Sequence, residues 1–152
     1  ELNINNMATI YETENFILES HEKPEIDRLE GGHVKISPKV EVEDRSKLTP
    51  EQAIELMRFT VISGEAMRLA MKKAGVDIGR INYQDNGNWK PQLHVHLYCR
   101  AENSVMQKYG EPIIPGHKEE YKPLNEEDIA NVKEELERLF KIEKNSDISW
   151  RL

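Results

Sequence analysis

Residues 92–98 alternate polar with aliphatic side chains, and this alternation constrains the local fold more tightly than any other feature of the chain. Successive side chains of a β-strand point to opposite faces, so Gln92, His94 and His96 are expected to share one face of a strand. Two imidazoles beside a carboxamide suit the binding of an anion, a metal ion or a proton in transit. The alternative is that two histidines are exposed on a strand by chance.

Other β-prone segments surround this strand. Residues 8–11 and 15–19 are short runs joined by a polar turn, which predicts an opening hairpin. Two glycines precede a strand that begins at His33 and ends at Pro38. Residues 77–83 predict a further strand, and residues 85–88, whose Asn-Gly pair tolerates positive φ, predict a turn that joins it to the antiparallel histidine strand.

Two helices are predicted. Thr49 is suited to cap the first, with Pro50 at its first position, Gln52 completing a capping box and Gly75 beyond its end. The apolar face of this helix is broad, and its methionines at helical spacing indicate core filling. Asn125 is suited to cap the second helix, which carries one apolar stripe.

The 152 residues predict a single domain. Its core spans about residues 8–100 and is followed by a long loop over 101–124, a C-terminal helix over 125–143 and a tail over 144–152. We expect the loop to be a functional or dimer-contact segment, and Trp150 in the tail to pack on an apolar surface.

Composition excludes several classes of partner. A net charge of −7 argues against bulk binding to nucleic acid or to anionic membranes, because that affinity comes from lysine and arginine. No apolar run approaches the roughly 20 residues that span a bilayer. Cys99 is the only cysteine, and the N-terminus lacks the features of a signal peptide, so a reducing, cytoplasmic location is expected.

The order of these segments resembles the histidine triad (HIT) superfamily. The resemblance covers about Phe16 to Arg100 and rests on the Gly-His strand at residues 32–38, the helix start at 48–52, the Asn- and Gly-containing segment at 81–87 and the histidine strand. Gln92 stands where the family has its first triad histidine. The resemblance implies an α+β fold with an antiparallel sheet of about five strands, one long central helix and a C-terminal helix, and a two-fold homodimer.

The resemblance also implies an activity, hydrolysis or transfer at the α-phosphorus of a nucleotide conjugate through a nucleotidyl-histidine. Candidate substrates are nucleoside phosphoramidates and dinucleoside polyphosphates, and no cofactor or metal is required. By position, His94 is the nucleophile, His96 donates to the phosphate or leaving group, and His33 supports the site from beneath. Asn82 matches the residue that contacts the ribose or phosphate.

Three further residues are candidate nucleotide contacts. Asn88 and Trp89 precede the strand, where the Trp89 ring could stack on a base or its N–H could donate. The Gln92 carboxamide could donate to a phosphate oxygen or accept from His94. His21 and His117 have no counterpart in the motif and are expected to be surface residues.

Other functions remain open at this point. A site without the first imidazole could bind nucleotides with little or no catalysis, as a pseudoenzyme or sensor. His94, His96 and His33 could instead form a three-imidazole zinc site with an open position for water. A pure interaction module would use the long loop and leave the histidines without a role.

Overall fold

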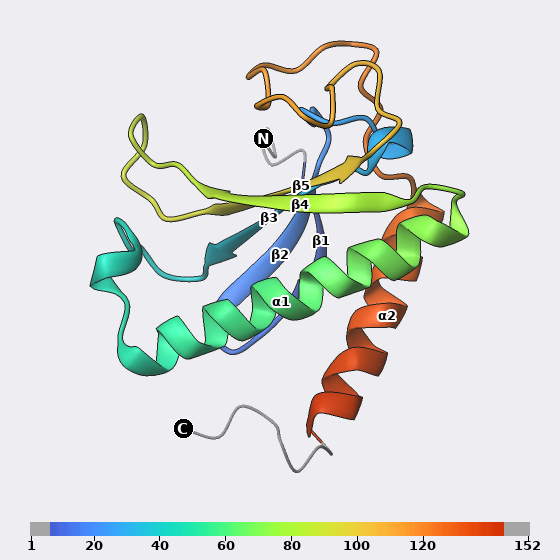
Figure 1. The fold of residues 1–152 in the computed structure, drawn as a ribbon. Coiled ribbons are helices and arrows are strands. Elements are labelled where there is room, and N and C mark those ends of the chain that lie inside the picture. Colours follow the sequence, from blue (N-terminus) through green and yellow to red (C-terminus); the bar gives the residue numbers. More distant parts are fainter. Residues whose placement is uncertain (1–6, 145–152) are drawn as a thin grey trace, which may run out of the picture.

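The computed structural model describes residues 7–144 and contains a five-stranded antiparallel sheet with two helices packed against one face (Figure 1). The strand order is β1-β2-β3-β5-β4, so β1 and β4 form the edges. The elements are β1 (Met7–Glu12), β2 (Phe16–His21), β3 (His33–Pro38), α1 (Pro50–Lys73), β4 (Ile78–Asp85), β5 (Val95–Ala101) and α2 (Glu126–Lys144), with two 3₁₀ turns, η1 (Arg28–Glu30) and η2 (Arg45–Lys47). The α+β fold expected from the sequence is confirmed.

Local signals set the ends of α1. The Thr49 hydroxyl accepts from the backbone N–H of Gln52 at 3.2 Å, and the Gln52 carboxamide oxygen accepts from the N–H of Thr49 at 3.0 Å. This reciprocal capping box satisfies two donors that a helix start otherwise leaves free. The helix ends before Gly75, whose φ of 81° reverses the chain toward β4. Both predicted boundaries are therefore confirmed.

A similar reciprocal pair starts α2. The Asn125 side chain accepts from the N–H of Asp128 at 2.8 Å, and the Asp128 carboxylate accepts from the N–H of Asn125 at 3.0 Å. Asp128 also binds the Arg28 guanidinium at 2.6 and 2.9 Å, which fixes the helix to the η1 turn. The start predicted at Asn125 is confirmed. Trp150 and the rest of the tail lie outside the described residues.

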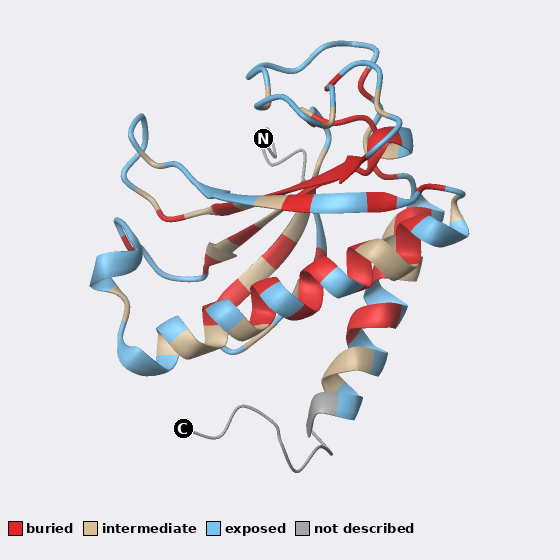
Figure 2. Ribbon diagram, in the orientation of Figure 1, coloured by how far each residue is buried: buried red, intermediate tan, exposed pale blue. Residues whose placement is uncertain are grey.

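The core lies between the sheet and the two helices (Figure 2). The inward faces of β3 and β5 contribute Val34, Ile36, Val95 and Leu97, all nearly or fully buried. From α1, the fully buried Met67 and Met71 fill this layer as expected, whereas Met57 is half exposed. The remaining core side chains come from both helices, all five strands and the loops between them. Among residues 7–144 no helix is long and apolar enough to cross a membrane.

The loop over 101–124 lies against the other face of the sheet and is held by charged side chains (Figure 1). The Glu30 carboxylate accepts from the backbone N–H groups of three consecutive loop residues, Val105, Met106 and Gln107, at 2.6 to 3.1 Å. The buried Arg100 guanidinium donates to the carbonyls of Lys108 and Glu111 at 2.6 and 2.9 Å. Such charge-assisted bonds order the loop although it contains no regular structure.

The histidine strand is shorter than the sequence predicts. β5 begins at Val95, and residues 86–94 form a loop that connects it to β4. The backbone N–H of Leu93 donates to the carbonyl of Val42 at 2.7 Å, outside the sheet. The expectation of one strand over 92–98 is therefore wrong. The Asn-Gly pair, which tolerates positive φ, does not use it here, because neither Asn86 nor Gly87 has a positive φ.

Candidate functional site

Strand alternation places the candidate residues on the face of the sheet away from the helices. Because Val34 and Leu97 point into the core, the neighbouring His33, Lys35, His96 and Tyr98 point to the opposite face. Antiparallel register sets His33 across from Tyr98 and Lys35 across from His96. We call this side of the sheet the open face.

Four imidazoles form a continuous row on the open face. The ring centroids of His94 and His96 are 4.9 Å apart, those of His96 and His33 are 5.0 Å apart, and those of His33 and His21 are 4.2 Å apart. The expectation that His21 is a plain surface residue is wrong. Its ring stacks on His33 at an interplanar angle of 22°, since β2 pairs with β3 so that His21 follows the Ser20–Val34 pair.

Hydrogen bonds set which nitrogen carries the proton in three of the four rings, His33, His96 and His94. The backbone N–H of Glu25 donates to Nδ1 of His33 at 3.2 Å, so the proton of His33 must lie on Nε2. That nitrogen is 2.8 Å from Nδ1 of His96 and donates to it. The proton of His96 therefore lies on Nε2, the nitrogen left for a ligand.

His94 has the opposite tautomer. Its Nδ1 is 2.8 Å from the carbonyl oxygen of Gln92, and a carbonyl can only accept, so Nδ1 carries the proton. The lone pair of Nε2 is then free. The row thus presents a nucleophilic nitrogen on His94 beside a hydrogen-bond donor on His96.

Burial keeps three rings of the row, His21, His33 and His96, uncharged. Burial, followed by the charge of His94, lowers the pKa of His96 from 6.5 to about 3. Burial, followed by the charge of Lys35, lowers the pKa of His21 to about 4, and burial above all lowers the pKa of His33 well below 6.5. At neutral pH these three rings are neutral, so His96 donates a hydrogen bond but holds no spare proton to give away.

Tyr98 and Glu25 connect the row to the long loop. The Tyr98 hydroxyl donates to the Glu25 carboxylate at 2.9 Å, and the other oxygen of that carboxylate accepts from the N–H of Gly116 at 3.3 Å. Burial, followed by the charge of Glu25, raises the pKa of Tyr98, which stays a neutral donor. The backbone of Glu25 also orients His33, so this one residue couples the loop to the row.

Asn82 lies on β4, across from Tyr98 in the register. Its Oδ1 accepts from the Arg100 guanidinium at 2.9 Å, so the remaining Nδ2 amide is the group that could donate to a ligand. Donation to a ribose or phosphate oxygen is the role that the sequence predicts for Asn82.

Gln92 has a different place from the one expected. Its Oε1 accepts from the N–H of Val42 at 3.2 Å, and its Nε2 donates to the carbonyl of Val40 at 3.1 Å. Both ends of the carboxamide bind the segment that follows β3, and the residue lies before β5 rather than on its open face. Gln92 thus contributes its backbone carbonyl to His94, while its side chain joins two loops.

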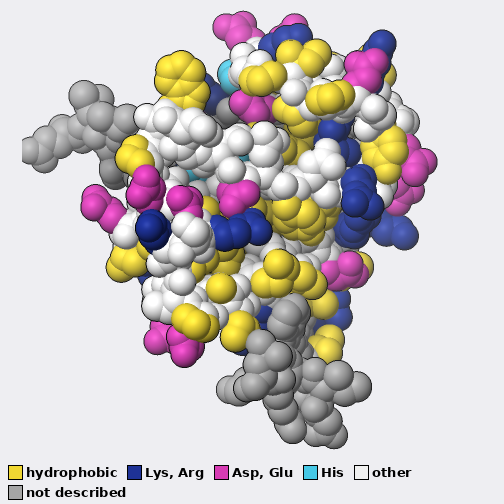
Figure 3. Space-filling view, turned by 60° about the vertical axis from the view of Figure 1, so that its left-hand side comes forward, with side chains coloured by type: hydrophobic (Ala, Val, Ile, Leu, Met, Phe, Trp, Pro, Cys, Tyr) yellow, Lys and Arg dark blue, Asp and Glu magenta, His cyan; other side chains and the backbone are white. Residues whose placement is uncertain are grey.

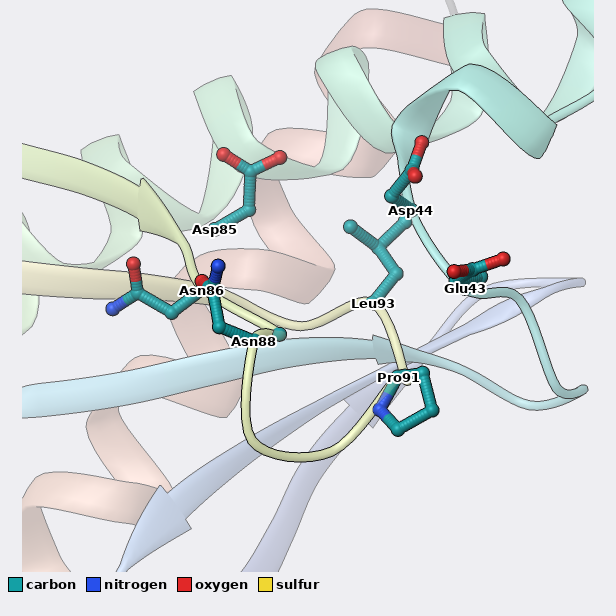
Figure 4. A pocket seen from close by; sticks show the side chains of 8 residues that line it. Glu43, Asp44, Asp85, Asn86, Asn88, Pro91 and Leu93 are labelled. Atoms are coloured by element: carbon teal, nitrogen blue, oxygen red, sulfur yellow. The ribbon is translucent and has the colours of Figure 1, made fainter.

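Asn88 and Trp89 lie in the loop over 86–94, and the Trp89 side chain is fully exposed. Asn88 lines a cavity of about 350 Å³ (Figure 4). The lining also includes the carboxylates of Glu43, Asp44 and Asp85, and no residue of the histidine row. Because three carboxylates repel phosphate, the open face rather than this cavity suits an anionic ligand.

The row includes a trio that could hold a metal ion. Ligand atoms of His21, His33 and His96 all lie within 4.8 Å of one another. This trio differs from the expected set of His94, His96 and His33. His21 was missed because its place beside His33 depends on the β2–β3 pairing, and residues 12 apart in sequence carry no local signal of it.

Comparisons with known proteins agree with this architecture. The family model of the HIT domain matches residues 4–103. A histidine triad protein from Marinobacter aquaeolei VT8 is 23% identical, with 90% of each chain covered and a TM-score of 0.63. A hypothetical histidine triad nucleotide-binding protein from Sulfolobus tokodaii strain 7 is 21% identical, with 95% of this chain and 92% of that chain covered and a TM-score of 0.60. A zinc-bound histidine triad family protein from Mycobacterium smegmatis is 20% identical, with 88% and 86% covered and a TM-score of 0.55. No match was found among curated proteins.

Proposed function

The chain belongs to the HIT-domain family, and from that premise we propose that it binds a nucleotide conjugate on the open face and cleaves it at the α-phosphorus. The observation that carries the proposal is the 2.8 Å bond from Nδ1 of His94 to the carbonyl of Gln92, which leaves Nε2 free to attack. His96 supplies the adjacent donor for a non-bridging oxygen.

The reaction has two displacement steps. In the first, the Nε2 lone pair of His94 forms a bond to phosphorus while the bond to the leaving group breaks, and its electron pair departs with the leaving group. In the second, a water oxygen attacks the same phosphorus, the P–N bond breaks, and its electrons return to Nε2. The water proton passes to solvent, and the products are the nucleotide and the free imidazole.

A substrate panel tests this function. Adenosine and guanosine phosphoramidates and dinucleoside polyphosphates are incubated with the protein, product release is measured, and copurified nucleotide is sought by mass spectrometry. Turnover of at least one class supports the hydrolase. Tight binding without turnover would favour the pseudoenzyme or sensor, a second candidate because Gln92 stands where the family motif is expected to have its first histidine. Absence of both would contradict the proposal.

We predict that zinc is not a cofactor. An imidazole that ligates zinc usually donates its second N–H to an acceptor, whereas Nδ1 of His33 instead receives the N–H of Glu25 at 3.2 Å. Binding at the other nitrogen would set two hydrogens against each other. The purified protein should therefore contain far less than one zinc per chain by elemental analysis and should keep its activity with a chelator. Stoichiometric zinc with chelator-sensitive turnover would establish a metallohydrolase instead.

We further propose a homodimer formed through α1 and the edge strand β4. Met57 and Val61 on α1 and Tyr83 on β4 are each about half exposed, although all three are large and apolar. The two elements are close, since the Tyr83 hydroxyl lies directly against Gly64, where a side chain would collide with it. In the space-filling view of Figure 3, hydrophobic side chains form patches among charged ones. Sedimentation velocity should give a dimer for the native protein and a monomer for Met57→Glu; an unchanged native monomer would contradict this interface.

A further inference from the structure

Lys35 is a half-buried cation in the middle of the open face. It lies on β3 directly across from His96, and strand alternation directs it to the same side as His33. Side chains directly opposite each other in an antiparallel pair are close enough to touch. Lys35 is therefore part of the surface that meets a ligand held by His94 and His96.

The Lys35 ammonium forms no ion pair within the described chain. Among residues 7–144 its side chain has no ion-pair partner within 4.0 Å and no hydrogen-bond partner. Glu19 on β2 lies directly across from it in the register but beyond that distance. The charges of Glu19 and Lys90 act on the pKa of Lys35. The charge of Lys35 in turn contributes to lowering the pKa values of His21, His33 and His96, so it lies close to all three rings. Lysines are seldom buried without a partner. In a protein of net charge −7, a half-buried lysine beside neutral imidazoles indicates a site that binds an anion.

The protonation of His96 restricts which leaving groups the site can release. The only nitrogen of His96 that faces a ligand carries a proton, and losing that proton would leave an anionic ring beside other buried rings. His96 can thus stabilise a departing group by hydrogen bonding but cannot protonate it. An amine must gain a proton to leave, whereas a phosphate, whose second pKa is near 6, departs as an anion.

We propose that Lys35 is a specificity-determining residue that binds a phosphate of the leaving group beside His96. The substrate is accordingly a nucleotide joined through its α-phosphorus to a phosphate or polyphosphate, and amine conjugates are poorer substrates. In the first step the P–O bond breaks, the bridging oxygen keeps the electron pair, and the ammonium of Lys35 with the N–H of His96 stabilises the new charge. This inference rests on the proposed function and adds the chemistry of the leaving group.

The test compares Lys35→Met, which keeps an apolar stem, with Lys35→Arg, which keeps the charge. Lys39→Met is the matched control, because Lys39 follows the same strand and pairs with the exposed Glu12 at 3.3 Å. Each variant is assayed with diadenosine tetraphosphate and with an adenosine phosphoramidate of a neutral amine. Lys35→Met should lower kcat/KM for the tetraphosphate by about 10–100-fold and for the phosphoramidate by less than about threefold. Lys35→Arg should retain most activity, and Lys39→Met should change neither substrate.

A binding measurement separates this inference from the proposed function. The native protein should bind ADP more tightly than AMP by calorimetry, and Lys35→Met should lose that preference. Equal losses on both substrates, or no loss in either, would overturn the role of Lys35 while leaving a functional hydrolase. Without any turnover, the ADP preference still decides the role of Lys35. A native protein that binds neither nucleotide would overturn the proposed function and this inference together.

Discussion

Replacement of His94 by Asn is expected to lower turnover by about three orders of magnitude or more, because the variant has no nitrogen lone pair that can attack phosphorus. Nucleotide affinity should change by less than about tenfold, since His96, Lys35 and Asn82 remain on the open face. Single-turnover kinetics measure the first effect and equilibrium titration measures the second.

His117→Asn is the matched control for this substitution. His117 is exposed, and its ring packs edge-on against Tyr121 rather than against a ring of the row. Its Nδ1 bonds at 2.7 Å to the carbonyl of Pro24, in the peptide unit whose N–H donates to His33, so Asn, which keeps a polar group there, is the conservative replacement. This variant should keep native turnover. A His94→Asn protein that retained more than about a tenth of native activity would show that another group attacks the substrate.

Acidification is expected to destabilise the protein strongly between pH 6.5 and about pH 4. Burial lowers the pKa of His21 to about 4 and of His96 to about 3, and it also lowers the pKa of His33. In the unfolded chain all three titrate near 6.5, so below that pH the unfolded state binds more protons than the native state. The contribution of these histidines to the free energy of unfolding is therefore fully present above pH 6.5 and is lost as the pH falls, by about 1–2 kcal/mol at pH 5 for each of His21 and His96 and in the same direction for His33.

Urea unfolding at pH 7 and pH 5 measures this loss. His21→Phe keeps a ring against His33 but removes one titrating group, so its stability should differ less between the two pH values than that of the native protein, by about 1–2 kcal/mol. His117→Phe replaces an exposed histidine and is the control. Identical pH dependence in the native and His21→Phe proteins would show that His21 titrates normally in the folded state.

The sequence predicted those features whose signals are local. The boundaries of α1 follow from Thr49, Gln52 and Gly75, whose contacts lie within a few residues of one another. The strand from His33 to Pro38 likewise follows from two glycines at one end and a proline at the other. The order of these segments was enough to indicate the family, which the match over residues 4–103 establishes.

Features that depend on distant parts of the chain were missed or misplaced. Gln92 fits a period-two strand pattern, but its carboxamide binds Val40 and Val42, about fifty residues earlier, and the strand starts only at Val95. The tautomer of His96 depends on His33 and, through it, on the backbone of Glu25. The position of Lys35 beside His96 depends on the register between β3 and β5, two strands that lie about sixty residues apart in the sequence, so neither strand shows it when taken by itself.

Detection of the covalent intermediate tests the central claim most directly. The protein is mixed with a substrate from the active class, the reaction is quenched in base to preserve a phosphorus–nitrogen bond, and the chain is weighed intact and after proteolysis. We predict a nucleotidyl adduct on His94 that forms and decays at rates consistent with turnover and is absent from His94→Asn. Turnover without an adduct, or an adduct on His96 in place of His94, would contradict the assignment of His94 as the nucleophile.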